Sequence, residues 1–128
     1  MKETGRNRKK FCVQLASGAA DPGRVKSALM FATLAAHSGC DTVLYCVQDG
    51  ADTVVKGKIR EEGKLSPGSP TFEQRLEEAR EAGVRFQICG QVAKNRNLTE
   101  KDLIEGCEIL GGVHLISYAL DYDGMLFF

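Results

Sequence analysis

Five cysteines are the residues in this sequence whose chemistry most needs explaining, because a thiol can act as a nucleophile, a metal ligand or a disulfide partner. They are Cys12, Cys40, Cys46, Cys89 and Cys107. No two of them have the two-residue spacing of zinc and redox motifs, and neither His37 nor His114 lies beside a cysteine pair. We therefore expect free thiols, no metal site and no cofactor, with most of the thiols buried as small apolar residues.

Cys89 differs from the other cysteines because it is the last residue of a predicted strand. Gly90 follows it, and the pattern then predicts a turn or a short helix. Unpaired N–H groups at a helix N-terminus favour a thiolate over a thiol, and Arg96 would add positive potential. Cys89 is therefore the candidate nucleophile.

The other four cysteines are predicted at positions that bury them or separate them from a site. Cys12 lies in the middle of the first predicted strand, and Cys46 precedes further strand residues. Cys40 and Cys107 come before strands, so a parallel sheet would place them at the edge opposite Cys89.

Alternating strand and helix patterns are expected to position these residues. Strands are predicted at 10–16, 42–47, 84–89, 108–112 and 125–128. Helices are predicted at 22–39, 51–56, 71–83, 98–103 and 113–120, and residues 57–69 are predicted to form a mobile surface loop. In the last helix, the spacing of Val113, Ile116 and Leu120 predicts that these side chains face the core.

This order of elements predicts an α/β fold: a three-layer, flavodoxin-like sandwich around a five-stranded, mostly parallel sheet. Ligands of such sheets bind outside the carboxyl ends of the strands. The candidate pocket around Cys89 therefore consists of Ser17, Gly18, Asp49, Gly50, Gly90 and Arg96. The turn that begins at Ser17 lacks a phosphate-loop motif, so we favour a simple strand-to-helix turn capped by Asp21 over a nucleotide site.

The composition is that of one ordinary globular domain. The chain has 128 residues, 43% of them hydrophobic and 27% charged, with 17 basic and 17 acidic side chains. We expect a flexible basic tail over residues 1–9 and a single domain over residues 10–128. The tail has no interleaved aromatic residues, which argues against nucleic-acid binding. No apolar run suits a membrane span or a secretory signal, so we expect a cytoplasmic protein without membrane partners.

Several short motifs occur in one order along nearly the whole chain, from Phe11 to Phe128. They are Leu15-Ala16-Ser17-Gly18, Asp21-Pro22, Asp49-Gly50, Gly83-Val84, Ile88-Cys89-Gly90, Leu103-Ile104-Glu105-Gly106 and Phe127-Phe128. In this the chain resembles the DsrE/DsrF-like family, which includes subunits of sulfur-relay complexes. The resemblance implies an α/β protein that assembles into homotrimers or homohexamers. With a glycine directly after Cys89, the chain resembles the broader, uncharacterised branch of the family more than the dedicated sulfur-relay subunits.

In several members of this family, a cysteine after the third strand accepts sulfur as a persulfide, and by position that residue is Cys89. The resemblance thus implies a sulfurtransferase-like carrier of sulfane sulfur, with protein donors and acceptors, more than a turnover enzyme. Two alternatives remain at this stage. One is a non-catalytic small-molecule or nucleotide-binding module, and the other is an oligomeric interaction subunit suggested by the apolar end at Met125–Phe128.

Overall fold

The computed structural model describes residues 8–60 and 68–128 and contains a five-stranded sheet in which all pairs are parallel. The strand order is β4-β3-β2-β1-β5. The strands are β1 (Lys10–Leu15), β2 (Asp41–Cys46), β3 (Arg85–Cys89), β4 (Glu108–Leu110) and β5 (Gly124–Phe127). The helices are α1 (Pro22–His37), η2 (Gln48–Thr53), α2 (Phe72–Glu81), α3 (Gly90–Asn95), η3 (Glu100–Asp102) and α4 (Gly112–Asp121). The predicted α/β class is confirmed.

Local signals in the sequence fix where the two long covering helices begin. The side chain of Asp21 accepts a hydrogen bond from the Arg24 N–H, and Pro22 occupies the first turn of α1. Thr71 and Gln74 form a capping box at the start of α2, each side chain bonding to the other residue's backbone N–H. These caps set the beginnings of two helices that pack on each other; α1 also packs on β1 and β2, and α2 contributes Phe72 and Ala79 to the same core.

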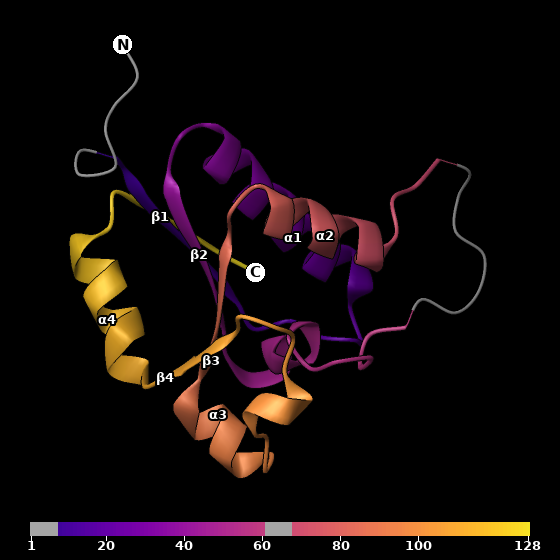
Figure 1. Ribbon diagram of the computed structural model, residues 1–128. Helices are drawn as coiled ribbons and strands as arrows, with labels where there is room; N and C mark the ends of the chain where they lie inside the picture. The colour runs from indigo at the N-terminus through magenta and orange to yellow at the C-terminus, as the bar shows by residue number, and fades with distance from the viewer. Residues whose placement is uncertain (1–7, 61–67) are drawn as a thin grey trace.

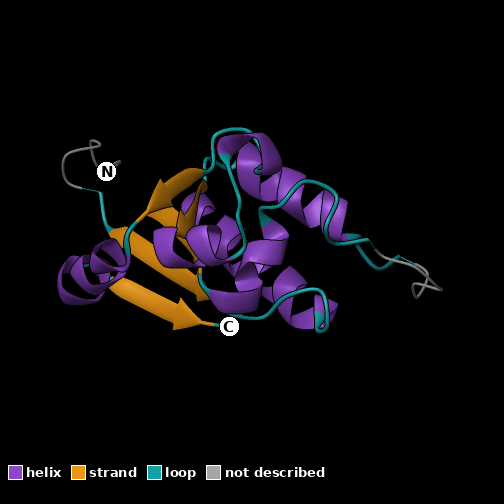
Figure 2. Cartoon of the chain, turned by 90° about the horizontal axis from the view of Figure 1, so that it is seen from below, coloured by secondary structure: helices purple, strands orange, loops and turns teal. Residues whose placement is uncertain are grey.

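The two faces of the sheet are covered unequally. In Figure 1, α1 and α2 lie on one side of the strands and α4 lies on the other, and Figure 2 shows this single helix apart from the rest. The larger core lies on the α1/α2 side and contains the fully buried Leu15, Leu29, Leu44 and Ile88. The α4 side has a smaller cluster, built on Cys12, Val43, Tyr45 and Tyr118.

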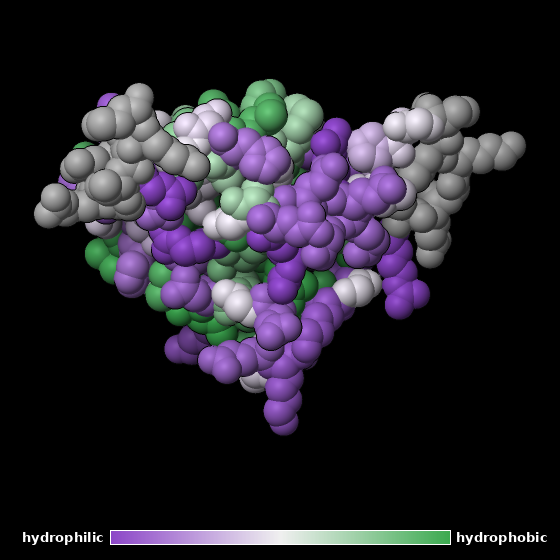
Figure 3. Space-filling view, turned by 45° about the horizontal axis from the view of Figure 1, so that its top comes forward, coloured by the Kyte–Doolittle hydropathy of each residue, from purple (hydrophilic) through white to green (hydrophobic). Residues whose placement is uncertain are grey.

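The prediction of which α4 side chains face inward is wrong. Val113, Ile116 and Leu120 point away from the sheet and are 72%, 60% and 79% exposed. Tyr118 is the buried residue of this helix instead, and Leu115 and Tyr122 pack beside it. Figure 3 shows hydrophobic side chains at the surface on the side of the molecule that α4 forms.

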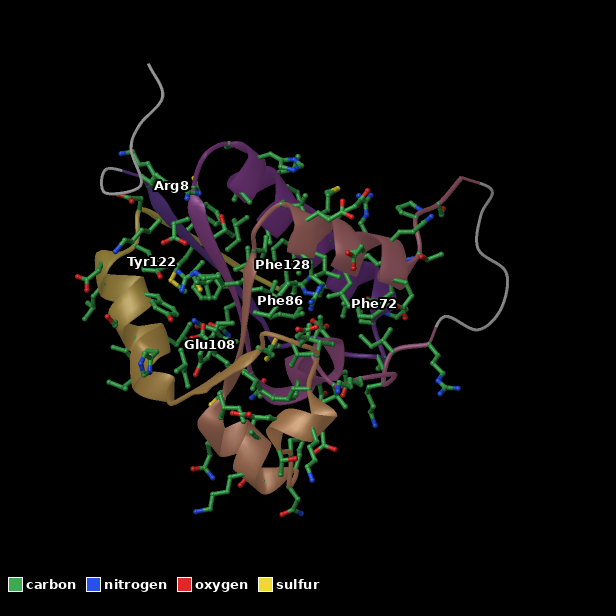
Figure 4. All side chains as sticks on the ribbon, viewed as in Figure 1. Arg8, Phe72, Phe86, Glu108, Tyr122 and Phe128 are labelled. Atoms are coloured by element: carbon green, nitrogen blue, oxygen red, sulfur yellow. The ribbon has the colours of Figure 1, made fainter. Side chains whose placement is uncertain are left out.

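The physical reason is that the sheet beneath α4 is partly polar. The Tyr118 hydroxyl donates to Gln87 Oε1 over 2.7 Å, and Gln87 Nε2 donates to Glu108 Oε1 over 3.1 Å. Figure 4 shows Glu108 and Tyr122 on this side of β3 and Phe86 on the other. A tyrosine can satisfy a buried amide while burying its ring, whereas an aliphatic side chain cannot.

Residues 1–7 of the predicted tail and 61–67 of the predicted loop lie outside the described residues. Arg8, at the end of the predicted tail, donates to the backbone oxygens of Gly39 and Cys40, both over 3.1 Å. Several expected boundaries shift. The helix predicted at 51–56 is η2, the helix predicted at 98–103 is the shorter η3, β2 ends at Cys46 and β4 ends at Leu110.

Candidate functional site

The carboxyl ends of the parallel strands meet at one edge of the sheet, and Cys89 lies at this edge. It is the last residue of β3 and the N-cap of α3, and its side chain makes no capping hydrogen bond. The residue is partly buried, unlike the fully buried Cys12 and Cys46. In Figure 1, α3 begins directly where β3 ends.

Burial raises the pKa of three of the five thiols. Desolvation raises the pKa of Cys12 to about 12, and it raises the pKa of the fully buried Cys46 well above its ordinary value. Burial and the neighbouring Glu108 carboxylate raise the pKa of Cys107 to about 12. These three sulfurs remain neutral thiols at neutral pH, which makes them poor nucleophiles.

Of the two remaining cysteines, Cys40 lies just before β2, at the edge of the sheet opposite Cys89. Cys89 is therefore the one cysteine that combines the carboxyl edge of the sheet with partial exposure.

The surroundings of Cys89 lie on the α4 side of the sheet. Its side chain packs against the cluster that contains Tyr45, with Leu110 beside it. Cys89 pairs with Leu110 in the β3–β4 register, and the Tyr45 hydroxyl donates to the Leu110 carbonyl oxygen over 2.8 Å. The Cys89 thiol is near enough to this hydroxyl to contribute, after desolvation by burial, to the raised pKa of Tyr45. A methyl group on Gly90 would approach the backbone of Gly111, the N-cap of α4, at 3.8 Å.

Tyr45 was not among the residues predicted from the sequence. It lies inside a run of apolar strand residues, where an aromatic side chain is expected for packing alone. Only the register of β2 against β3, which pairs Tyr45 with Gln87, shows that it shares a face with Cys89.

The other predicted pocket residues form a cluster at the same edge. Gly18 and Gly50 are packed so closely that a side chain on the first would overlap the Asp49 carbonyl oxygen, and one on the second would overlap the Leu15 carbonyl oxygen. The Ser17 hydroxyl donates to the Phe128 carbonyl oxygen over 3.0 Å. These contacts join the ends of β1, η2 and the C-terminus.

Arg96 is held by carboxylates rather than directed at Cys89. Its guanidinium donates to Asp49 Oδ1 over 2.8 Å and to Asp52 Oδ1 over 3.1 Å. Asp52 also accepts from the Ala19 N–H. Arg96 is the C-cap of α3 and Cys89 its N-cap, so the helix, roughly 9 Å long, separates them. The expected positive potential of Arg96 at Cys89 is therefore weakened by distance and by pairing.

A surface hollow of about 500 Å³ lies beside this ion-pair cluster. Its lining residues are Asp49, Asp52, Val55, Lys58, Arg96 and Leu98. Cys89 is not among them, so the hollow and the thiol occupy different parts of the same edge.

Within residues 8–60 and 68–128, histidine, cysteine and acidic side chains form no group of three that could hold a metal ion. None of the helices in those ranges has the length and apolar character needed to cross a bilayer.

The protein is a parallel α/β sandwich with a partly exposed cysteine at the end of its third strand. The DsrE/DsrF-like family model matches residues 9–128. The chain belongs to the DsrE/DsrF-like family, which confirms the resemblance seen in the sequence, and this membership indicates sulfur relay at the level of the family.

The chain is also similar to uncharacterised proteins and to a solved structure. An uncharacterised protein of Methanopyrus kandleri, MK0008, is 30% identical over 105 residues, which is 82% of each chain. MJ0989 of Methanocaldococcus jannaschii, also uncharacterised, is 29% identical and covers 93% of this chain and 99% of its own. The crystal structure of the ychN protein from E. coli has a TM-score of 0.76 at 21% identity, covering 94% of this chain and 99% of that one. This last likeness confirms the fold.

The raised pKa of Cys12 predicts a loss of stability at alkaline pH. Its folded-state pKa of about 12 lies above the ordinary 9.0, so the unfolded chain ionises first, and stability present below pH 9.0 is lost as pH rises toward 12. At about pH 10, Cys12 alone lowers the free energy of unfolding by about 1 kcal/mol relative to neutral pH. Urea titrations at the two pH values check this.

Cys12→Ala should reduce that alkaline loss by the same amount. Val13→Ala is the matched control, because it removes buried volume from the same strand without removing a titratable group. An equal pH dependence in the parent and in Cys12→Ala would show that the Cys12 thiol is not held protonated by the fold.

Proposed function

We propose that the protein carries sulfane sulfur as a persulfide on Cys89. The observation that supports this is the position of Cys89: the carboxyl edge of a parallel sheet, the start of α3 and partial exposure coincide at this one cysteine. Family membership supplies the class of chemistry. All five cysteines are free, which suits a reducing compartment, and we assign the protein to the cytoplasm on that ground.

The transfer is two displacements at sulfur. The Cys89 thiolate attacks the terminal sulfur of a donor persulfide, a new S–S bond forms at Cys89 Sγ, and the donor's own S–S bond breaks. The bonding electrons leave with the donor thiolate, and the terminal proton stays on the transferred sulfur. An acceptor thiolate then attacks the same outer sulfur and Cys89 leaves as a thiolate. Because neither step needs an external oxidant or reductant, the protein requires no cofactor.

The direct test is sulfur uptake followed by intact mass measurement after incubation with a persulfide donor. We expect the parent to gain one sulfur atom and Cys89→Ser to gain none, because the other thiols are buried or lie elsewhere in the fold. Cys40→Ser is the matched control, since it removes a partly buried cysteine at the opposite edge of the sheet, and it should load as the parent does. Undiminished uptake by Cys89→Ser would refute the assignment.

Self-association through α4 is a second part of the proposal. The outer stripe of α4, defined by Val113, Ile116 and Leu120, is apolar, uncharged and exposed. An uncharged apolar stripe is complementary to itself, so another copy of this chain is the partner that fits it. Three stripes that meet about a threefold axis would cover one another, as the expected homotrimer or homohexamer requires.

Ile116→Glu should convert such an assembly to monomer, because it buries a charge in the contact without touching the core of the subunit. Light scattering coupled to size-exclusion chromatography measures the change. Leu34→Glu, on the exposed part of α1, is the control and should keep the parent mass. A monomeric parent, or an assembly that only Leu34→Glu disrupts, would contradict this interface.

A further inference from the structure

We infer that the Tyr45 hydroxyl is the hydrogen-bond donor that stabilises the anionic sulfur of Cys89, and that it exchanges the Leu110 carbonyl for that sulfur when the thiol ionises. This inference rests on the proposed function, because it concerns the reactivity of the same thiol. It adds a residue on a different strand, and it assigns the activation of Cys89 to a buried side chain.

The geometry brings the three groups together from three adjacent strands. Tyr45 is on β2, Cys89 ends β3 and Leu110 ends β4. Cys89 and Leu110 are register partners, so the Leu110 carbonyl that accepts the Tyr45 proton at 2.8 Å lies beside the cysteine. The Tyr45 ring is fully buried and forms an edge-to-face contact with Tyr118 at 6.2 Å, which holds the hydroxyl at the carboxyl edge of the sheet.

The hydroxyl has one hydrogen, which the Leu110 carbonyl accepts over 2.8 Å. Its second acceptor in this inference is the sulfur of Cys89, which pairs with Leu110 and packs against the cluster that contains Tyr45. While Cys89 is a thiol, its S–H can donate to the Tyr45 oxygen and the Tyr45 O–H donates to Leu110. A thiolate can only accept. The Tyr45 hydrogen then gains more by turning to the charged sulfur, because a hydrogen bond to an ionised acceptor is stronger than one to a neutral carbonyl.

Tyr45 remains a donor over the whole range in which a thiol ionises. Burial, followed by the charge and the hydrogen bond of Cys89, raises the pKa of Tyr45 above its ordinary value of 10.0. The phenol therefore keeps its proton when the thiol loses one, and no proton passes between the two groups.

The test is the pH dependence of alkylation at Cys89, followed with iodoacetamide and site-resolved mass spectrometry. In Tyr45→Phe the midpoint should rise by roughly one pH unit, because the thiolate loses a charge-assisted hydrogen bond. At neutral pH the alkylation rate should fall about threefold, since the higher intrinsic nucleophilicity of the more basic thiolate offsets part of the loss.

Tyr118→Phe is the matched control. It deletes a buried tyrosine hydroxyl with a comparable hydrogen bond on the same face, but one that donates to Gln87. An unchanged midpoint in Tyr45→Phe, or an equal rise in Tyr118→Phe, would overturn the inference. Absence of sulfur uptake by the parent would refute persulfide carriage and leave the alkylation result for Tyr45 intact, so the two failures are distinguishable.

If Tyr45→Phe does not fold, fluorine NMR of the protein without that substitution tests the same inference. With 3-fluorotyrosine incorporated, the fluorine resonance of Tyr45 should move with the midpoint of Cys89 alkylation, and this movement should vanish in Cys89→Ser. A Tyr45 resonance that ignores the ionisation of Cys89 would overturn the inference without any change at Tyr45.

Discussion

The parallel alignment of the five strands is the constraint on which the rest of this structure depends. Because every strand runs the same way, all carboxyl ends share one edge. Within each strand, side chains alternate between the α1/α2 face and the α4 face. This alternation buries Cys12 and Cys46 completely on opposite faces and leaves Cys89 partly exposed where β3 stops. Cys89 thus differs from the other cysteines in its position, and we propose that its reactivity follows from where β3 ends.

The α4 side of the sheet combines features that differ from those of the α1/α2 side. Gln87 and Glu108 make the sheet polar beneath α4, so the helix packs on it through tyrosines. The exposed Val113, Ile116 and Leu120 of the helix face outward. Tyrosine packing also holds Tyr45 beside Cys89. Tyrosines occupy inward-facing positions on this side of the sheet. Their presence there therefore explains both the exposed stripe of α4 and the hydroxyl available to the thiol.

Fold class was predictable from the sequence because caps and apolar runs act locally. Asp21, Thr71 and the buried β2 segment indicate their elements without help from tertiary structure. The orientation of α4 was not predictable, because its period of apolar residues fits either face and only the polar sheet beneath it decides between them. Cys89 could be placed at a strand end, but its neighbour Tyr45 depends on the register of two strands that are distant in sequence.

We propose that the fold makes Cys89 the most reactive of five chemically identical side chains. Site-resolved alkylation rates of all five cysteines in the native protein at neutral pH test it most directly. We expect Cys89 to be labelled first, ahead of Cys40 and Cys107, and we expect Cys12 and Cys46 to be labelled only on unfolding. Labelling of Cys89 at the rate of Cys12 or Cys46 would contradict it.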